Sequence, residues 1–237
     1  MSPTKIIIAL AGIFQLLFLT LLSVHLANHG DAGGKAIICM TWGVVILWVG
    51  FFGTLIWLCR RRFTNWAQRL SVTGGWRAKF VLLATAAALV EEAVTTALTN
   101  LAPLFGSKVG EAYITASANY LDVVCCHSVV VFVPMFCCWA WMFGRVDFTR
   151  SQAFLLFGIT GILSEVLAFG PQGVLNSGLW IFVYGLILLP ALYSLPERPN
   201  LRLPRFYHFP LAVILPVLWS IPVAALVYWL HPYPTHF

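Results

Sequence analysis

Long apolar runs constrain this chain more than any other feature of its sequence. Hydrophobic residues make up 60% of the 237 residues and charged residues only 9%, whereas about a quarter of the residues in a soluble domain are charged. The runs have the roughly 20-residue length at which a helix crosses the hydrocarbon core of a bilayer. We expect spans over residues 6–27, 36–59, 80–100, 112–144, 152–170, 173–195 and 209–231.

These runs predict an all-α fold, a polytopic transmembrane helical bundle of about seven spans. The segments between them are short, so we expect residues 1–237 to form a single integral-membrane domain in the lipid bilayer, a multi-pass protein of the cell membrane. The run over 112–144 is too long for one upright helix, and it predicts either a strong tilt or a bend near Pro134.

Basic residues predict the orientation of the spans. If the spans alternate as expected, twelve of the 14 Lys and Arg residues lie on one side of the membrane, and only Lys35 and Lys108 lie on the other. Lys and Arg concentrate in cytoplasmic loops, so the amino terminus should be cytoplasmic and the carboxyl terminus outside. The net charge of +6 is then explained by orientation, and we expect no nucleic-acid partner.

Two adjacent carboxylates, Glu91 and Glu92, stand in the middle of the third expected span. A charged side chain at the bilayer centre costs at least ~2.5 to 3.5 kcal/mol on insertion scales, and such residues usually face a protein interior or a wet cavity. Glu92 shares a helix face with small and hydroxylated residues such as Ala88 and Thr96, the type that packs helices closely in membranes. The pair predicts a polar site inside the bundle.

Other polar side chains are expected at a similar depth in the next two spans. Asn119, Asp122 and Cys126 share one face of an ideal helix, and His127 lies ~140° from Asp122 on that helix, so the two need not contact the same ligand. In the fifth span Glu165 continues a stripe with Gly158 and Gly161, which would let another backbone come close.

Four carboxylates and an imidazole cannot all be ionised together in a dry interior without a compensating cation. Shared protons, water or a divalent metal such as zinc would supply the balance, and Glu92, His127 and Glu165 are the ligands we expect for such a metal. The alternative is structural, because protonated acids also form hydrogen bonds between membrane helices.

The Glu91–Glu92 pair, a histidine one span later and the phrase GITGILSE ending at Glu165 resemble motifs of the superfamily of CAAX proteases, bacteriocin-processing proteins and related glutamate-type intramembrane proteases. Such a resemblance implies a bundle of membrane helices in which a glutamate activates water for peptide hydrolysis. Glu91, Glu92 and His127 would then be catalytic, and Asn119, Asp122 and Glu165 would bind the substrate or a cation.

Two classes of function are therefore consistent with the sequence. The first is an intramembrane peptidase that acts on a membrane-adjacent peptide. The second is a non-enzymatic carrier of cations or protons, or a metal-binding subunit that assembles with partner subunits in a membrane complex, because buried acids also mark proton relays and ion routes.

Overall fold

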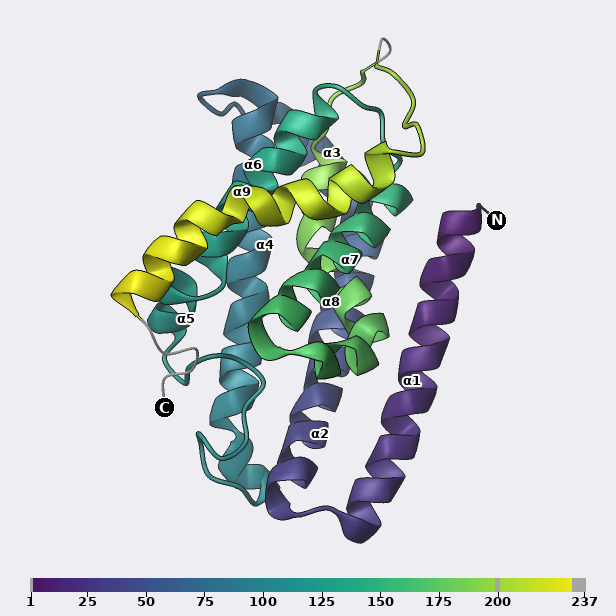
Figure 1. The fold of residues 1–237 in the computed structure, drawn as a ribbon. Coiled ribbons are helices and arrows are strands. Elements are labelled where there is room, and N and C mark those ends of the chain that lie inside the picture. Colours follow the sequence, from purple (N-terminus) through teal and green to yellow (C-terminus); the bar gives the residue numbers. More distant parts are fainter. Residues whose placement is uncertain (1, 199–200, 232–237) are drawn as a thin grey trace.

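The computed structural model of the protein describes residues 2–198 and 201–231, and most of these residues are helical (Figure 1). Six helices are long and apolar enough to cross a membrane, and the bent pair α5 and α6 makes a seventh if it is one span. The expected all-α membrane bundle is confirmed. In chain order the helices are α1 (Pro3–His29), α2 (Ala32–Val44), the π-helix η1 (Val45–Phe52), α3 (Gly53–Arg69), α4 (Gly75–Asn100), the 3₁₀ turn η2 (Ala102–Phe105), α5 (Tyr120–Cys126), α6 (Val129–Phe143), α7 (Arg150–Phe169), the 3₁₀ turn η3 (Pro171–Asn176), α8 (Ser177–Tyr193) and α9 (His208–Leu230).

The second span is longer than the sequence predicts. Helices α2, η1 and α3 form one continuous helix of 38 residues, so the arginines that follow Cys59 lie on its last turns and not in a loop. The end of this helix is tied to the next one, because the Lys79 ammonium group on α4 donates hydrogen bonds to the carbonyls of Ala67 (2.8 Å) and Leu70 (3.1 Å). The connection between these two helices covers residues 70–74, whereas the expected spans left residues 60–79 between them.

The fourth expected span is broken, and the break lies before Pro134. Helix α5 ends at Cys126, and α6 begins at Val129 after a bend of 44°. The backbone of His127 leaves the helical region, with φ −135° and ψ −85°. Pro134 lies within α6. The expected bend is present, but its position was wrong, because His127 and not the proline interrupts the helix.

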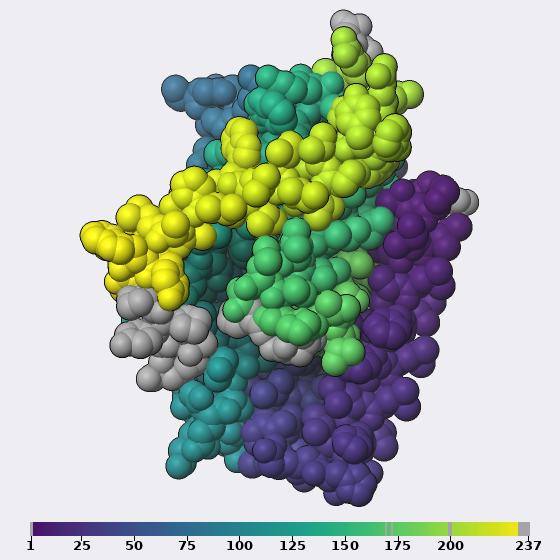
Figure 2. All heavy atoms as spheres, in the orientation of Figure 1, coloured from purple at the N-terminus to yellow at the C-terminus, as the bar shows by residue number. Residues whose placement is uncertain are grey.

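Helix α8 lies at the centre of the bundle, in contact with α1, α4 and α7. Helix α6 packs between α4 and α9. Helix α9 crosses α6 and α7 obliquely (Figure 1), and the space-filling view shows it as a ridge over that face of the molecule (Figure 2). Helices α4 and α7, which carry Glu91, Glu92 and Glu165, thus both pack against α8.

The connection between α4 and α5 folds back onto the end of α4. The Asn100 side-chain amide donates to the Ala118 carbonyl (2.9 Å), and the Thr99 hydroxyl accepts from the Ile114 backbone N–H (3.3 Å). Gly106 and Gly110 adopt positive φ values of 87° and 90°, which let the chain turn sharply. This connection therefore returns its second half toward the middle of α4.

Candidate functional site

Two buried carboxylates and a half-buried one lie near one another inside the bundle. We call Glu91, Glu92, Glu165 and Tyr184 the acid site. Glu91 and Glu92 on α4 are each only 5% exposed. Glu165 on α7 interacts electrostatically with both of them. Helices α4 and α7, which are far apart in the sequence, therefore place acidic side chains in one region. Helix α8 contacts both of these helices.

Tyr184 joins the two helices from α8. Its hydroxyl donates a hydrogen bond of 2.5 Å to the Glu165 carboxylate, and the ring lies within electrostatic range of Glu91 and Glu92. Gly161 makes room for this ring, because a Cβ atom at that position would lie 2.0 Å from the ring carbon Cδ2. The sequence predicted that another backbone comes close to this glycine stripe. The structure confirms the prediction at Gly158, where a Cβ atom would lie 2.6 Å from the Ile181 backbone.

Hydroxyl groups surround the Glu92 carboxylate. The Thr95 hydroxyl lies 3.2 Å from Oε2 of Glu92, one helical turn along α4. Thr115 and Ser128 also form side-chain hydrogen bonds with Glu92. Thr115 belongs to the connection that folds back between α4 and α5. Ser128 lies at the break between α5 and α6. Two irregular segments thus complete a polar shell around a residue in mid-span.

No basic side chain of the described residues forms an ion pair with the acid site. In the described ranges the ion pairs are Lys108–Glu111, His127–Asp122 and Arg198–Asp147, and none of them includes a member of the acid site. Three neighbouring carboxylates cannot all be ionised in a dry interior without a proton or a cation among them. The arrangement therefore suits the binding of a positively charged species.

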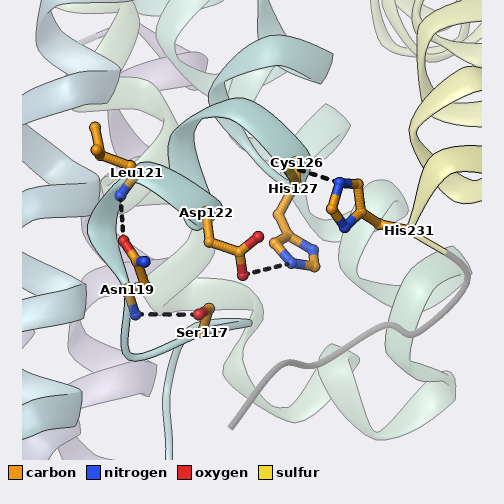
Figure 3. A network of polar contacts seen from close by, with 7 residues as sticks. All are labelled: Ser117, Asn119, Leu121, Asp122, Cys126, His127 and His231. Carbon is orange, nitrogen blue, oxygen red and sulfur yellow. Dashed lines mark hydrogen bonds and ion pairs between the residues drawn. The ribbon is translucent and has the colours of Figure 1, made fainter.

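A second polar cluster lies at the break between α5 and α6 (Figure 3). The His127 Nε2 atom is 3.5 Å from Oδ2 of Asp122, and the Cys126 thiol is 3.3 Å from Nε2 of His231 at the end of α9. Asn119 has a structural role beside it, because its side-chain oxygen caps α5 by accepting from the Leu121 N–H at 3.0 Å. The cluster combines thiol, imidazole and carboxylate groups.

The structure divides the predicted site residues between these two places. Glu91, Glu92 and Glu165 meet in the acid site, whereas Asp122 and His127 pair with each other at the break. Within the ranges that the structure describes, the potential ligands close enough to share one ion are Asp122, Cys126 and His231, whose ligand atoms all lie within 4.8 Å of one another. Glu92, His127 and Glu165 do not meet this criterion, and their joint binding of a metal stays a prediction.

Several members of both sites were not predicted from the sequence. Tyr184 carries an isolated hydroxyl group within an apolar run, and this isolated polar group was the signal that could have indicated a buried hydrogen bond. Ser128 and Thr115 lie in irregular segments, where no helical periodicity relates them to Glu92. Cys126 and His231 are 105 residues apart, and no local pattern connects them.

Two grooves on the surface have apolar walls. One lies beside α4 and includes Leu47, Val94 and Tyr120 in its lining. The other lies between α3 and α8 and includes Trp57 and Leu186. Neither groove is lined by a residue of the acid site, so neither gives a large substrate a direct route to these carboxylates.

Comparison with known proteins finds no match to a protein-family model, to a curated protein or to a solved structure. Function is therefore inferred from the residues and their arrangement.

Proposed function

We propose that this integral membrane protein binds and exchanges protons or a small cation at the acid site. The observation that carries the proposal is the grouping of Glu91, Glu92 and Glu165 with Tyr184 in the core, away from the ion pairs of the described residues. Acids in such a position inside a membrane bundle are typical of proton relays and ion routes.

The surroundings of Glu92 favour a small species over a large one. The hydroxyl groups of Thr95, Thr115 and Ser128 can each donate to a carboxylate or accept from a bound donor. The surface grooves are apolar and have no acid-site residue in their linings. A proton or a small ion can move between such oxygens with side-chain rotations alone.

Proton flux into vesicles tests the proposal. The purified protein is reconstituted into liposomes that enclose a pH-sensitive dye, and a potassium diffusion potential drives cations inward. We expect acidification faster than in protein-free liposomes, and we expect Glu92→Gln and Glu165→Gln to return it to that background. Glu111→Gln is the matched control, because Glu111 is an exposed acid paired with Lys108 outside the site.

Sodium transport in place of proton flux would keep the proposal and identify the ion, and a sodium-sensitive dye measures it in the same vesicles. No flux of protons or sodium above the protein-free rate would overturn the proposal, provided that the protein elutes as a single folded species. Equal flux in wild type and both site variants would overturn it as well.

An intramembrane peptidase is the second candidate, and one contact favours it. Glu92 forms a hydrogen bond with Ser128, the residue that follows His127. The glutamate pair is therefore close to the break that contains His127, the histidine that the resemblance to glutamate-type intramembrane proteases makes catalytic. In this proposal Glu91 or Glu92 activates water as a general base, and the substrate is a peptide at the membrane.

The two candidates are separated by one assay on the same vesicles. A fluorogenic peptide with a single apolar membrane segment is co-reconstituted with wild type, Glu92→Gln or Glu111→Gln. Cleavage that disappears only in Glu92→Gln, without ion flux in any protein, would replace the first proposal by the second. Ion flux without cleavage would support the first.

A further inference from the structure

The ends of two distant helices meet at the break between α5 and α6. Asp122 and Cys126 are one turn apart on α5, so their side chains share a face of that helix. His231 follows the last turn of α9 and brings its ring to the Cys126 thiol (Figure 3). In Figure 1 this end of α9 lies beside α5. A carboxylate, a thiol and an imidazole, three different types of metal ligand, thus lie close together.

The spacing of the donor atoms suits a single metal ion. The Cys126 Sγ and His231 Nε2 atoms are 3.3 Å apart, and the Asp122 carboxylate also interacts with the Cys126 thiol. Two ligand atoms on one tetrahedral zinc ion, at bond lengths of 2.0 to 2.3 Å, are separated by about 3.3 to 3.8 Å. The side chains therefore need only small rotations to enclose an ion.

The geometry points to a zinc-class metal site formed by Asp122, Cys126 and His231. Thiolate, imidazole and carboxylate are the three donor types that zinc accepts, and water would complete a tetrahedral set. His127 has a positioning role, because its Nε2 atom lies 3.5 Å from Oδ2 of Asp122 and can orient that carboxylate.

A metal here would fasten α9 to the rest of the bundle. Helix α9 crosses the bundle obliquely, and most of its large side chains are exposed, such as Tyr228 and Trp229. The ion would join its last turn to α5, a seven-residue helix that is too short to be stable alone. This site shares no residue with the acid site, so the inference does not depend on the proposed function.

Cobalt(II) binding tests the site, because cobalt replaces zinc and reports a bound thiolate by an intense near-ultraviolet absorption. The probe is cobalt(II) alone, titrated into the full-length protein in detergent under reducing conditions. We expect one equivalent to bind with this absorption. Cys126→Ala should abolish the absorption, and His231→Ala or Asp122→Asn should weaken cobalt binding at least about tenfold.

Matched controls lie close by in the chain. Cys125→Ser changes the neighbouring exposed thiol, and His25→Ala changes one of two histidines that lie together on α1, with ring centroids 5.4 Å apart. Both should bind cobalt as wild type does. No thiolate absorption in wild type, or an absorption that survives Cys126→Ala, would overturn the inference.

A measurement on the unaltered protein guards against misfolded variants. Zinc chloride should slow the alkylation of Cys126 by N-ethylmaleimide, whereas Cys125 should react at the same rate with and without zinc, as mass spectrometry of the peptides would show. Equal alkylation of Cys126 with and without zinc would contradict the site even if every variant failed to fold.

Discussion

The Tyr184 hydroxyl on α8 lies 2.5 Å from the Glu165 carboxylate on α7, and this contact joins the two most closely packed helices of the bundle at the acid site. Tyr184 is buried, with 7% of its surface exposed. Removal of its hydroxyl would leave the half-buried Glu165 carboxylate without this donor, which is more costly than the loss of a contact at the surface.

We therefore expect Tyr184→Phe to lower the free energy of unfolding by about 1 to 3 kcal/mol, the cost of losing a hydrogen bond to an acceptor that is withdrawn from water. Thermal unfolding of the purified protein in detergent measures the change. Tyr228→Phe is the matched control, because Tyr228 on α9 is 67% exposed, and it should unfold at the wild-type temperature. A Tyr184→Phe protein as stable as wild type would show that the hydrogen bond is not important for stability.

Gly158→Ala should destabilise the protein by about 1 to 3 kcal/mol, the usual cost of overpacking. The added methyl group would lie 2.6 Å from the Ile181 Cα and 2.8 Å from its carbonyl oxygen, and backbone cannot move aside as a side chain can. Gly33→Ala is the control, since the nearest atoms to its Cβ are 3.8 Å away, and alanine favours helix there. Thermal unfolding of both variants in the same detergent provides the comparison, and equal midpoints would contradict the close packing of α7 on α8.

Gly161→Ala should impair the acid site itself. Its methyl group would overlap the Tyr184 ring, and a ring that turns away can no longer donate to Glu165. We expect ion flux in liposomes to fall toward that of Glu165→Gln, whereas Gly33→Ala should keep the wild-type rate. Wild-type flux in Gly161→Ala would show that the position of Tyr184 does not affect the site.

Periodicity predicted those parts of the protein that are regular helix. The apolar runs located the helices, and the small-residue stripe marked where α7 meets α8, at the Ile181 backbone for Gly158 and at the Tyr184 ring for Gly161. Bilayer energetics predicted that Glu91 and Glu92 face the interior, and both are buried. These predictions hold because side-chain direction in a helix follows from sequence position alone.

The remaining features depend on where a helix stops, which the sequence does not specify. An ideal helix separates Asp122 from His127 by ~140°, yet the two side chains lie 3.5 Å apart because α5 ends at Cys126. The contact between Cys126 and His231 depends on the oblique path of α9. Neither the break nor that path leaves a periodic signal, so the contacts of Asp122 with His127 and of Cys126 with His231 could not be predicted.

Arg198 should stabilise the connection after α8 more than a lysine could. Its guanidinium donates to the Phe143 carbonyl at 2.8 Å and to the Asp147 carboxylate at 3.0 Å. Burial lowers the pKa of Arg198, and Asp147 acts in the opposite direction, so the group keeps its charge at neutral pH. Lysine cannot make both contacts with the same planar geometry, and we expect Arg198→Lys to cost about 1 kcal/mol.

Thermal unfolding again measures this cost, with Lys108→Ala as the control. Lys108 forms an ion pair with Glu111, but the two side chains are 84% and 59% exposed, and such pairs contribute little. The control should unfold close to the wild-type temperature. A larger loss in Lys108→Ala than in Arg198→Lys would contradict the importance that we assign to burial.

The bias of basic residues predicts which lysines face the outside of a cell. Helix α4 carries Lys79 near its first turn, and Lys108 lies in the connection after its last turn, so the two are at opposite ends of one span. A membrane-impermeant amine reagent applied to intact cells should label Lys35 and Lys108. Lys5, which is also exposed, should be labelled only after the membrane is opened. Mass spectrometry of the peptides gives the result, and labelling of Lys5 in intact cells would reverse the proposed orientation.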